Sequence, residues 1–151
     1  MSAVAPVEIA AVRAALADVA DPEIPVLSIV DLGVVERVAV DERGIEVDLL
    51  PTFIGCPALD AIRDAVATRL ARFDRPVDVR LSHATPWTTD RITVRGRAAL
   101  RAAGIAPPDD PCCPWCGSTD VAMDNLFGPT QCRSVHYCRG CRQPFEAFKP
   151  V

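Results

Sequence analysis

Apolar residues recur along the chain with two different periods, and these periods predict where helices and strands form. The first helix is predicted from four apolar residues at intervals of three or four: Ile9, Val12, Leu16 and Val19. Such spacing is typical of the buried face of a helix. We expect this helix to end before residue 21, because the two prolines of the segment 21–25 are incompatible with a helix interior.

Three short segments predict β-strands. Residues 34–40 are rich in valine, which favours strands. Residues 45–49 alternate apolar and acidic side chains with a period of two, and residues 77–81 alternate apolar and polar side chains in the same way. The polar, glycine-containing segment 41–44 separates the first two strands and predicts a hairpin between them.

A second helix is predicted to begin at Pro57, because the first helical position leaves its backbone N–H unpaired and a proline has none to lose. Its core face contains four apolar residues: Leu59, Ile62, Val66 and Leu70. A further short helix is expected over residues 98–103, where Gly104 ends it.

The order helix, strand, strand, helix, strand predicts an α+β fold, in which a small mixed sheet carries its helices on one face. The proline-rich, polar segment 107–111 is typical of a linker. We therefore expect two domains with separate cores. The first covers residues 1–106, and the second covers residues 112–151 and contains six of the seven cysteines.

The C-terminal part contains two Cys-x-x-Cys pairs, formed by Cys113 with Cys116 and by Cys138 with Cys141. Two residues between cysteines allow a tight turn to direct both sulfurs at one ion, and two such turns complete a tetrahedral site. Gly117 and Gly140 are expected to supply the backbone freedom of these turns. A segment of about forty residues rarely folds unaided, so the pattern predicts a C-terminal zinc ribbon with a structural zinc ion.

Other residues near these pairs leave the ligand set open. Cys132 lies six residues before Cys138 and is a possible extra ligand or part of a second sulfur site. His136 is a further candidate, whereas Cys112 adjoins Cys113, and two neighbouring cysteines rarely bind the same ion. Four cysteines also suit an iron–sulfur cluster or mononuclear iron, although the spacing and the turn type favour zinc.

Cys56 is the one cysteine outside the C-terminal part, and it directly precedes the helix predicted from Pro57. At this position the helix dipole and the unpaired N–H groups of the helix start would lower the pKa of a thiol. Cys56 is therefore a candidate nucleophile or soft-metal ligand. The alternative role is that of a small, buried apolar side chain.

Acidic residues flank the proline-containing loop: Asp21, Glu23 and Asp31. They are candidate ligands or anchors for that loop, although the pattern alone favours turn and helix-cap roles. A polar cluster over residues 83–90 either binds a ligand or closes a loop. His83 within it is more typical of a hydrogen-bonded structural residue than of a catalyst.

The charge distribution argues against a nucleic-acid partner. Residues 1–111 carry 12 arginines and 17 acidic residues (net −5), and residues 112–151 carry four basic and three acidic residues (net +1). Neither part has a basic stripe. No apolar run approaches the roughly 20 residues of a membrane span, and the N-terminus lacks the features of a secretory signal, so we expect a cytoplasmic protein. Motifs of a self-sufficient enzyme are absent from the sequence.

Several segments together resemble known families. Residues 21–33 (DPEIPVLSIVDLG), 51–58 (PTFIGCPA) and 87–90 (WTTD) resemble the metal–sulfur cluster biosynthesis family. The resemblance extends to nearly the whole chain through four C-terminal segments: 113–118 (CPWCGS), 127–132 (FGPTQC), 138–141 (CRGC) and 144–149 (PFEAFK). With these, the chain is similar to the D-subunit family of bacterial phenylacetyl-CoA epoxidase systems.

The resemblance implies a non-catalytic, accessory subunit of aerobic phenylacetate catabolism that acts in assembly or maturation of an iron or iron–sulfur centre. Transient iron or a cluster would be handled by Cys56, with Asp21, Glu23 and Asp31 as candidate neighbours. Expected partners are the oxygenase and/or reductase subunits, and the sequence leaves open whether the chain forms a homodimer. The alternative is a structural or regulatory zinc-ribbon subunit that binds the oxygenase complex without delivering metal.

Overall fold

The computed structural model describes residues 6–53, 56–110 and 112–151. Its helices are α1 (Ile9–Leu16), α2 (Ile29–Leu32), α3 (Ala58–Leu70) and α4 (Val94–Ala102), with 3-10 turns η1 (Ala71–Phe73) and η2 (Thr89–Arg91). Its strands are β1 (Val35–Val40), β2 (Ile45–Leu49), β3 (Val77–Leu81), β4 (Ile105–Ala106), β5 (Val121–Asn125), β6 (Arg133–Cys138) and β7 (Pro144–Phe148). None of the helices in these ranges is long and apolar enough to cross a membrane.

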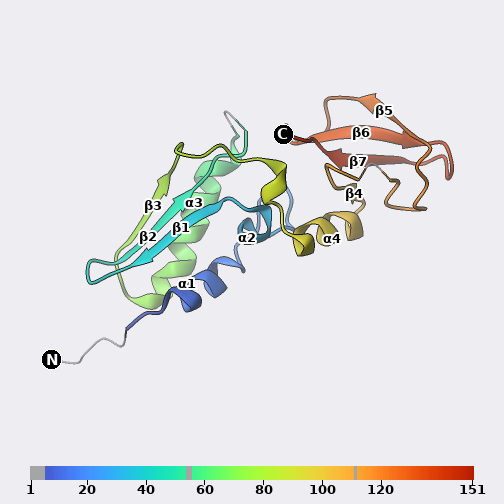
Figure 1. The fold of residues 1–151 in the computed structure, drawn as a ribbon. Helices are drawn as coiled ribbons and strands as arrows, with labels where there is room; N and C mark the ends of the chain where they lie inside the picture. Colours follow the sequence, from blue (N-terminus) through green and yellow to red (C-terminus); the bar gives the residue numbers. More distant parts are fainter. Residues whose placement is uncertain (1–5, 54–55, 111) are drawn as a thin grey trace.

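The first sheet has the strand order β1–β2–β3 and carries α1 and α3 on one face (Figure 1). β1 and β2 pair antiparallel through the hairpin, whereas β2 and β3 run parallel and are connected through α3. Along β2, Ile45, Val47 and Leu49 are buried, and the two acidic residues between them are more exposed. The predicted α+β class with a small mixed sheet is therefore confirmed.

The helix α3 begins at Ala58, one residue after the start that the sequence pattern predicted. Pro57 occupies the N-cap position, one residue before the first helical residue. Ile62, Val66 and Leu70 recur every four residues and are buried, because this spacing returns each of them to the face that contacts the sheet and α1. The position of Cys56 is thereby set by the start of a helix that is well anchored in the core.

The proline-containing segment after α1 is held by its own side chains and includes α2, which the sequence pattern did not predict. The Oδ1 atom of Asp21 accepts a hydrogen bond from the backbone N–H of Glu23 (2.7 Å), which forms a tight turn. Ser28 caps α2, since its hydroxyl oxygen accepts from the backbone N–H of Asp31 (3.0 Å). Gly33 ends α2 in the left-handed conformation, with φ of +78°.

Replacing Gly33 with alanine is expected to lower the free energy of unfolding by about 2–4 kcal/mol, through backbone strain and a steric clash together. An alanine Cβ would clash with the backbone oxygen of Arg91. Gly117→Ala is the matched control, because Gly117 has a similar φ of +77° but a Cβ there would meet no atom within 4 Å. Thermal unfolding of both variants measures the difference, and equal losses of stability would argue against a clash at Gly33.

The second sheet has the strand order β4–β7–β6–β5 (Figure 1). β6 pairs antiparallel with β5 and β7, and β4 pairs parallel with β7. The boundary predicted at residues 107–111 differs from this arrangement, because β4 lies before it and yet belongs to the second sheet. A strand of two residues is too short to show a period, so its pairing could not be found from the sequence pattern.

The two sheets share part of one hydrophobic core. Phe148, at the end of β7, and Cys132, just before β6, are buried in the same cluster as the core of the first sheet. The ring of Phe148 lies 6.0 Å from the ring of Trp87. Arg133 Nη2 also donates a hydrogen bond to the backbone oxygen of Glu23 (3.0 Å). The second sheet also has a small core of its own, formed by Ala106, Cys113, Cys138, Phe145 and Ala147, and the end of this sheet packs directly on the first domain.

The polar cluster over residues 83–90 closes a loop. Trp87 is buried, and its Nε1–H donates to the backbone oxygen of Leu32 (2.9 Å). Thr89 is also buried, and its hydroxyl donates to the backbone oxygen of Val151 (3.1 Å). His83 is exposed. Of the two roles that the sequence left open for this cluster, these contacts support the structural one.

Candidate functional site

The two Cys-x-x-Cys pairs meet at one end of the second sheet. Their four sulfur atoms lie within 4.8 Å of one another, with 3.8 Å between those of Cys113 and Cys141 and 3.6 Å between those of Cys116 and Cys138. Four sulfurs held tetrahedrally at about 2.3 Å from a zinc ion stand about 3.8 Å apart. The arrangement therefore fits a single metal ion of this size.

The same backbone turn forms both pairs. In the first pair, the backbone N–H of Gly117 donates to the carbonyl oxygen of Cys113 (2.9 Å), and Gly117 has φ of +77°. In the second pair the equivalent residue is Arg142, with φ of +59°. The prediction that Gly140 supplies the backbone freedom of the second turn is wrong. Gly140 instead provides space, because a Cβ there would lie 3.0 Å from the side chain of Ser118.

The electrostatics of the four sulfurs suit a metal centre. The backbone N–H of Cys141 donates to the sulfur of Cys138 and lowers the pKa of Cys138 to about 7, which favours the thiolate that metals bind. Burial raises the pKa of Cys141 to about 12, so an ion must displace the proton of that thiol. Because cysteines supply all four ligand positions, a bound ion would keep no open position for a substrate.

Three other candidates lie outside this centre. The thiol of Cys112 is hydrogen-bonded to the carboxylate of Asp110, which raises the pKa of Cys112. The ring of His136 stacks on that of Phe145, with 5.4 Å between the ring centres. Cys132 belongs to the core of the first domain. Within the described ranges, the four paired cysteines are the group that gathers three or more potential metal ligands.

Cys56 lies half-buried at the turn into α3. Burial raises the pKa of its thiol, and the negative charges of Glu23 and Asp21 raise it further. The backbone N–H of Ala58 donates to the sulfur and opposes this shift, as expected at a helix start, but it does not outweigh it. The prediction of a lowered pKa is wrong, because it took account of the helix start but not of burial, which has the largest effect, or of the charges of Glu23 and Asp21.

A small cavity lies beside Cys56 and is lined from both domains. It brings together Asp21 and Glu23 from the loop after α1, Cys56 from the start of α3, and Cys132 from the segment before β6. Its volume is about 10 Å³, close to what a single water molecule needs. The sequence had placed Cys132 near the other cysteines; only the contact between the domains reveals it as a neighbour of this cavity.

Asp31 is not brought to this cavity. Thr93 Oγ1 donates to its Oδ1 (2.8 Å), and Arg95 Nε donates to its Oδ2 (3.0 Å), so the carboxylate ties α2 to the start of α4. Burial by itself would raise the pKa of Asp31, but the hydrogen bonds from Thr93 and Arg95 outweigh burial and lower it. These contacts support the anchoring role that the sequence left open beside the ligand role.

Replacing Asp31 with asparagine is expected to lower the free energy of unfolding by about 1–2 kcal/mol at pH 7. Because the folded-state pKa lies below the ordinary value of 3.8, the carboxylate stabilises the fold above that value and loses this contribution as the pH falls through the folded-state pKa. The difference between the wild type and the variant should therefore shrink as the pH falls below 3.8. Urea titrations at neutral and acidic pH measure it, and a difference of constant size would contradict this role.

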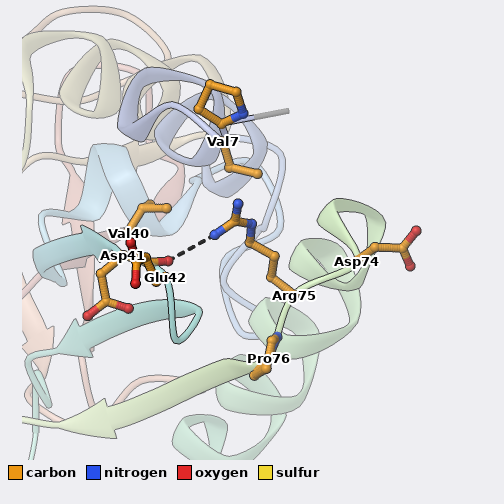
Figure 2. A pocket seen from close by; sticks show the side chains of 8 residues that line it. Val7, Val40, Asp41, Glu42, Asp74, Arg75 and Pro76 are labelled. Atoms are coloured by element: carbon orange, nitrogen blue, oxygen red, sulfur yellow. Dashed lines mark hydrogen bonds between the residues drawn. The ribbon is translucent and has the colours of Figure 1, made fainter. Parts of the chain in front are cut away.

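An open hollow lies at the other end of the first sheet, beside the turn between β1 and β2 (Figure 2). Arg75 Nη1 donates to the backbone oxygen of Asp41 across it (2.9 Å), and Asp74 points away from Arg75. Its described lining contains no cysteine or histidine. The hollow therefore offers no soft-metal ligands, and the candidate site remains at Cys56.

Comparisons with known proteins divide the chain in the same way as the two sheets. Residues 9–82 match the family described as iron-sulfur cluster assembly protein, and residues 97–149 match the PaaD zinc beta ribbon domain. Over its whole length, the chain is 37% identical to the putative D subunit of the 1,2-phenylacetyl-CoA epoxidase of Escherichia coli (strain K12), and the match covers 98% of that protein.

Other similar proteins match only part of this chain. The Fe-S protein maturation auxiliary factor SufT of Staphylococcus aureus (strain USA300) is 38% identical over 54% of this chain and 96% of its own. A solved DUF59 domain from Bacillus anthracis is 28% identical, with a TM-score of 0.50 and coverage of 59% of this chain and 87% of its own. The conserved hypothetical protein TM0487 from Thermotoga maritima is 26% identical, with a TM-score of 0.54 and coverage of 63% and 95%.

Proposed function

We propose, from the premise that this chain belongs to the D-subunit family of 1,2-phenylacetyl-CoA epoxidases, that it acts in assembly or maturation of an iron or iron–sulfur centre of the oxygenase complex. It would serve aerobic phenylacetate catabolism as an accessory subunit without catalysis of its own. The observation that carries the proposal is Cys56. This half-buried thiol shares a cavity with Asp21 and Glu23, in the part of the chain that matches iron–sulfur cluster assembly proteins.

The chemistry of this cavity suits brief binding of the iron that is to be passed to the oxygenase, which we call the cargo. A thiol with a raised pKa keeps its proton at neutral pH, so an iron ion must displace that proton in order to bind to Cys56. The competition makes binding weaker than at a preformed thiolate and favours release. Asp21 and Glu23 disfavour the free thiolate, but the same negative charges attract a divalent cation.

We assign the four-cysteine centre to structural zinc. Cys113, Cys116, Cys138 and Cys141 would hold the ion, which would cross-link the two turns at the end of the second sheet. Two observations support this assignment, namely the sulfur spacing and the match of residues 97–149 to a zinc ribbon family. The ion would stabilise the ribbon and take no part in the handling of cargo.

A second candidate function is favoured by exposed apolar side chains along one edge of the ribbon. Met123, Leu126 and Phe127 are 57%, 51% and 77% exposed, on or next to the edge strand β5. Such a surface suits contact with another protein. In this alternative the chain is a structural or regulatory subunit that binds oxygenase or reductase subunits without delivering metal.

The two functions differ in stoichiometry, which a reconstitution experiment measures. Iron-free oxygenase is incubated with Fe²⁺, a sulfide source and increasing amounts of this chain, and the iron content and phenylacetyl-CoA epoxidation are then followed. An assembly factor acts on many client molecules in turn, so we expect full activation well below an equimolar ratio. Activation that rises until one chain is present per complex would instead identify a structural subunit.

A further inference from the structure

The cavity beside Cys56 contains a second thiol, which the C-terminal domain supplies. The side chain of Cys132 is 8% exposed and lines the cavity together with that of Cys56. The charges of Asp21 and Glu23 act on the thiols of both cysteines. The two cysteines therefore share a cavity with the same pair of acidic residues, although they belong to different domains.

Cys132 has surroundings that packing alone would not require. Its sulfur lies outside the four-sulfur centre and 3.1 Å from the hydroxyl oxygen of Thr130. A cysteine that serves only as a small apolar side chain is expected among apolar neighbours. Cys132 has apolar neighbours such as Phe148, but the cavity that it lines also carries two carboxylates and another thiol, and a hydroxyl lies against its sulfur. This mixture of soft and hard donors suits a transition-metal ion.

Contacts within the C-terminal domain, and one between the domains, hold Cys132 in this place. The backbone N–H of Lys149 donates to the carbonyl oxygen of Cys132 (2.8 Å). The neighbouring Arg133 donates from Nη2 to the backbone oxygen of Glu23 (3.0 Å) and from Nη1 to the carboxylate of Glu146 (2.7 Å). The residue next to Cys132 is thus attached directly to the loop that carries the carboxylates, so the position of the second thiol is built into the domain contact.

We propose that Cys132 is a second sulfur ligand for the cargo of Cys56, so that the two domains share one binding site for a thiophilic divalent cation. That the cargo is iron rests on the proposed function. On binding, each thiol releases its proton to solvent, two metal–sulfur bonds form, and a carboxylate of Asp21 or Glu23 completes the set. These donors are not gathered within 4.8 Å as those of the ribbon centre are. The ion must therefore draw them together, which favours release over permanent retention.

This assignment also gives the zinc ribbon a function at the cargo site, namely to position Cys132. The four-cysteine centre stabilises the sheet in which β6 follows Cys132, and β7 ends at Phe148 on the wall of the same cavity. Folding of the ribbon thereby places the thiol of Cys132 at the cavity. A first domain without a ribbon would offer Cys56 and its carboxylates alone.

The test uses the full-length, zinc-loaded protein under anaerobic, reducing conditions, with Co²⁺ as the probe. Charge transfer from thiolate to cobalt reports sulfur ligation, and zinc release is followed so that exchange at the ribbon centre is recognised. We expect Cys132→Ser and Cys56→Ala each to bind Co²⁺ at least about tenfold more weakly, since loss of even an outer-shell partner costs about 10–100-fold. The charge-transfer band per bound ion should fall to about half. Cys112→Ala is the matched control, a cysteine outside the cavity, and should bind like the wild type.

The outcomes separate this inference from the proposed function. Wild-type binding by Cys132→Ser, with binding lost in Cys56→Ala, would overturn the two-thiol site and leave the role of Cys56 standing. Unchanged binding in both variants would overturn both. Cys132→Ala is measured in parallel, in case Cys132→Ser disturbs the fold. The conclusion is drawn from whichever Cys132 variant keeps its zinc and has an unchanged unfolding midpoint.

Discussion

Replacing Cys138 with serine is expected to reduce bound zinc from about one ion per chain to almost none and to unfold the second sheet. Cys138 is fully buried at the end of β6, where its sulfur faces the other three. Structural zinc contributes about 10–16 kcal/mol to the folding of small zinc domains, which equals or exceeds the total stability of a typical domain, about 5–15 kcal/mol. Elemental analysis measures the metal, and circular dichroism follows the loss of strands.

The shared core determines how far this damage spreads. Phe148 would lose its place against Trp87, and loss of a buried phenylalanine side chain costs about 3–5 kcal/mol. We therefore expect the first domain to stay folded but to unfold at a lower temperature, with the helical signal of α1 and α3 retained. Cys112→Ser is the control and should keep its zinc. Full zinc content in Cys138→Ser would refute the ligand assignment, and complete loss of helical signal would show that the first domain depends on the ribbon.

Replacing Cys56 with alanine is expected to abolish the support of the oxygenase and to leave the fold intact. Cys56 is half-buried, and the substitution removes a single sulfur atom, so the loss of stability should stay near 1 kcal/mol. The functional loss should be far larger, because the cargo loses the ligand next to both carboxylates. The measurement is phenylacetyl-CoA oxidation and iron content of an oxygenase matured with the variant, which should equal those of an oxygenase matured without this chain.

Two control variants make the result specific to the sulfur of Cys56. Cys56→Ser preserves the size of the side chain and should be as inactive as Cys56→Ala. Cys112→Ala removes a thiol from outside the cavity and should support maturation fully. If an oxygenase matured with Cys56→Ala had wild-type activity and iron content, the proposed role of Cys56 would be contradicted and the structural-subunit alternative favoured.

Local sequence alone predicted most strands and helices of the first domain and the cysteine pairs, but not α2 or β4. The alternation along β2 and the four-residue spacing of Ile62, Val66 and Leu70 predicted the buried faces correctly, because a side chain's direction follows from its position in a regular element. The two Cys-x-x-Cys turns predicted sulfurs that converge, since the geometry of each turn depends on a few adjacent residues. The direction of a side chain and the form of each turn depend on short segments, whereas the meeting of the two turns joins residues 22 and 28 positions apart.

The tertiary structure alone decided what lies around those segments. It joined the two predicted cores through Phe148, placed Cys132 beside Cys56, and engaged Asp31 with Arg95 of α4. It also reversed the expected shift in the pKa of Cys56, because that pKa depends on burial and on carboxylates far away in the sequence as well as on the helix start. Periodicity reports which face of an element is buried, but not which distant residues it meets. The composition of the candidate cargo site is for that reason a property of the fold.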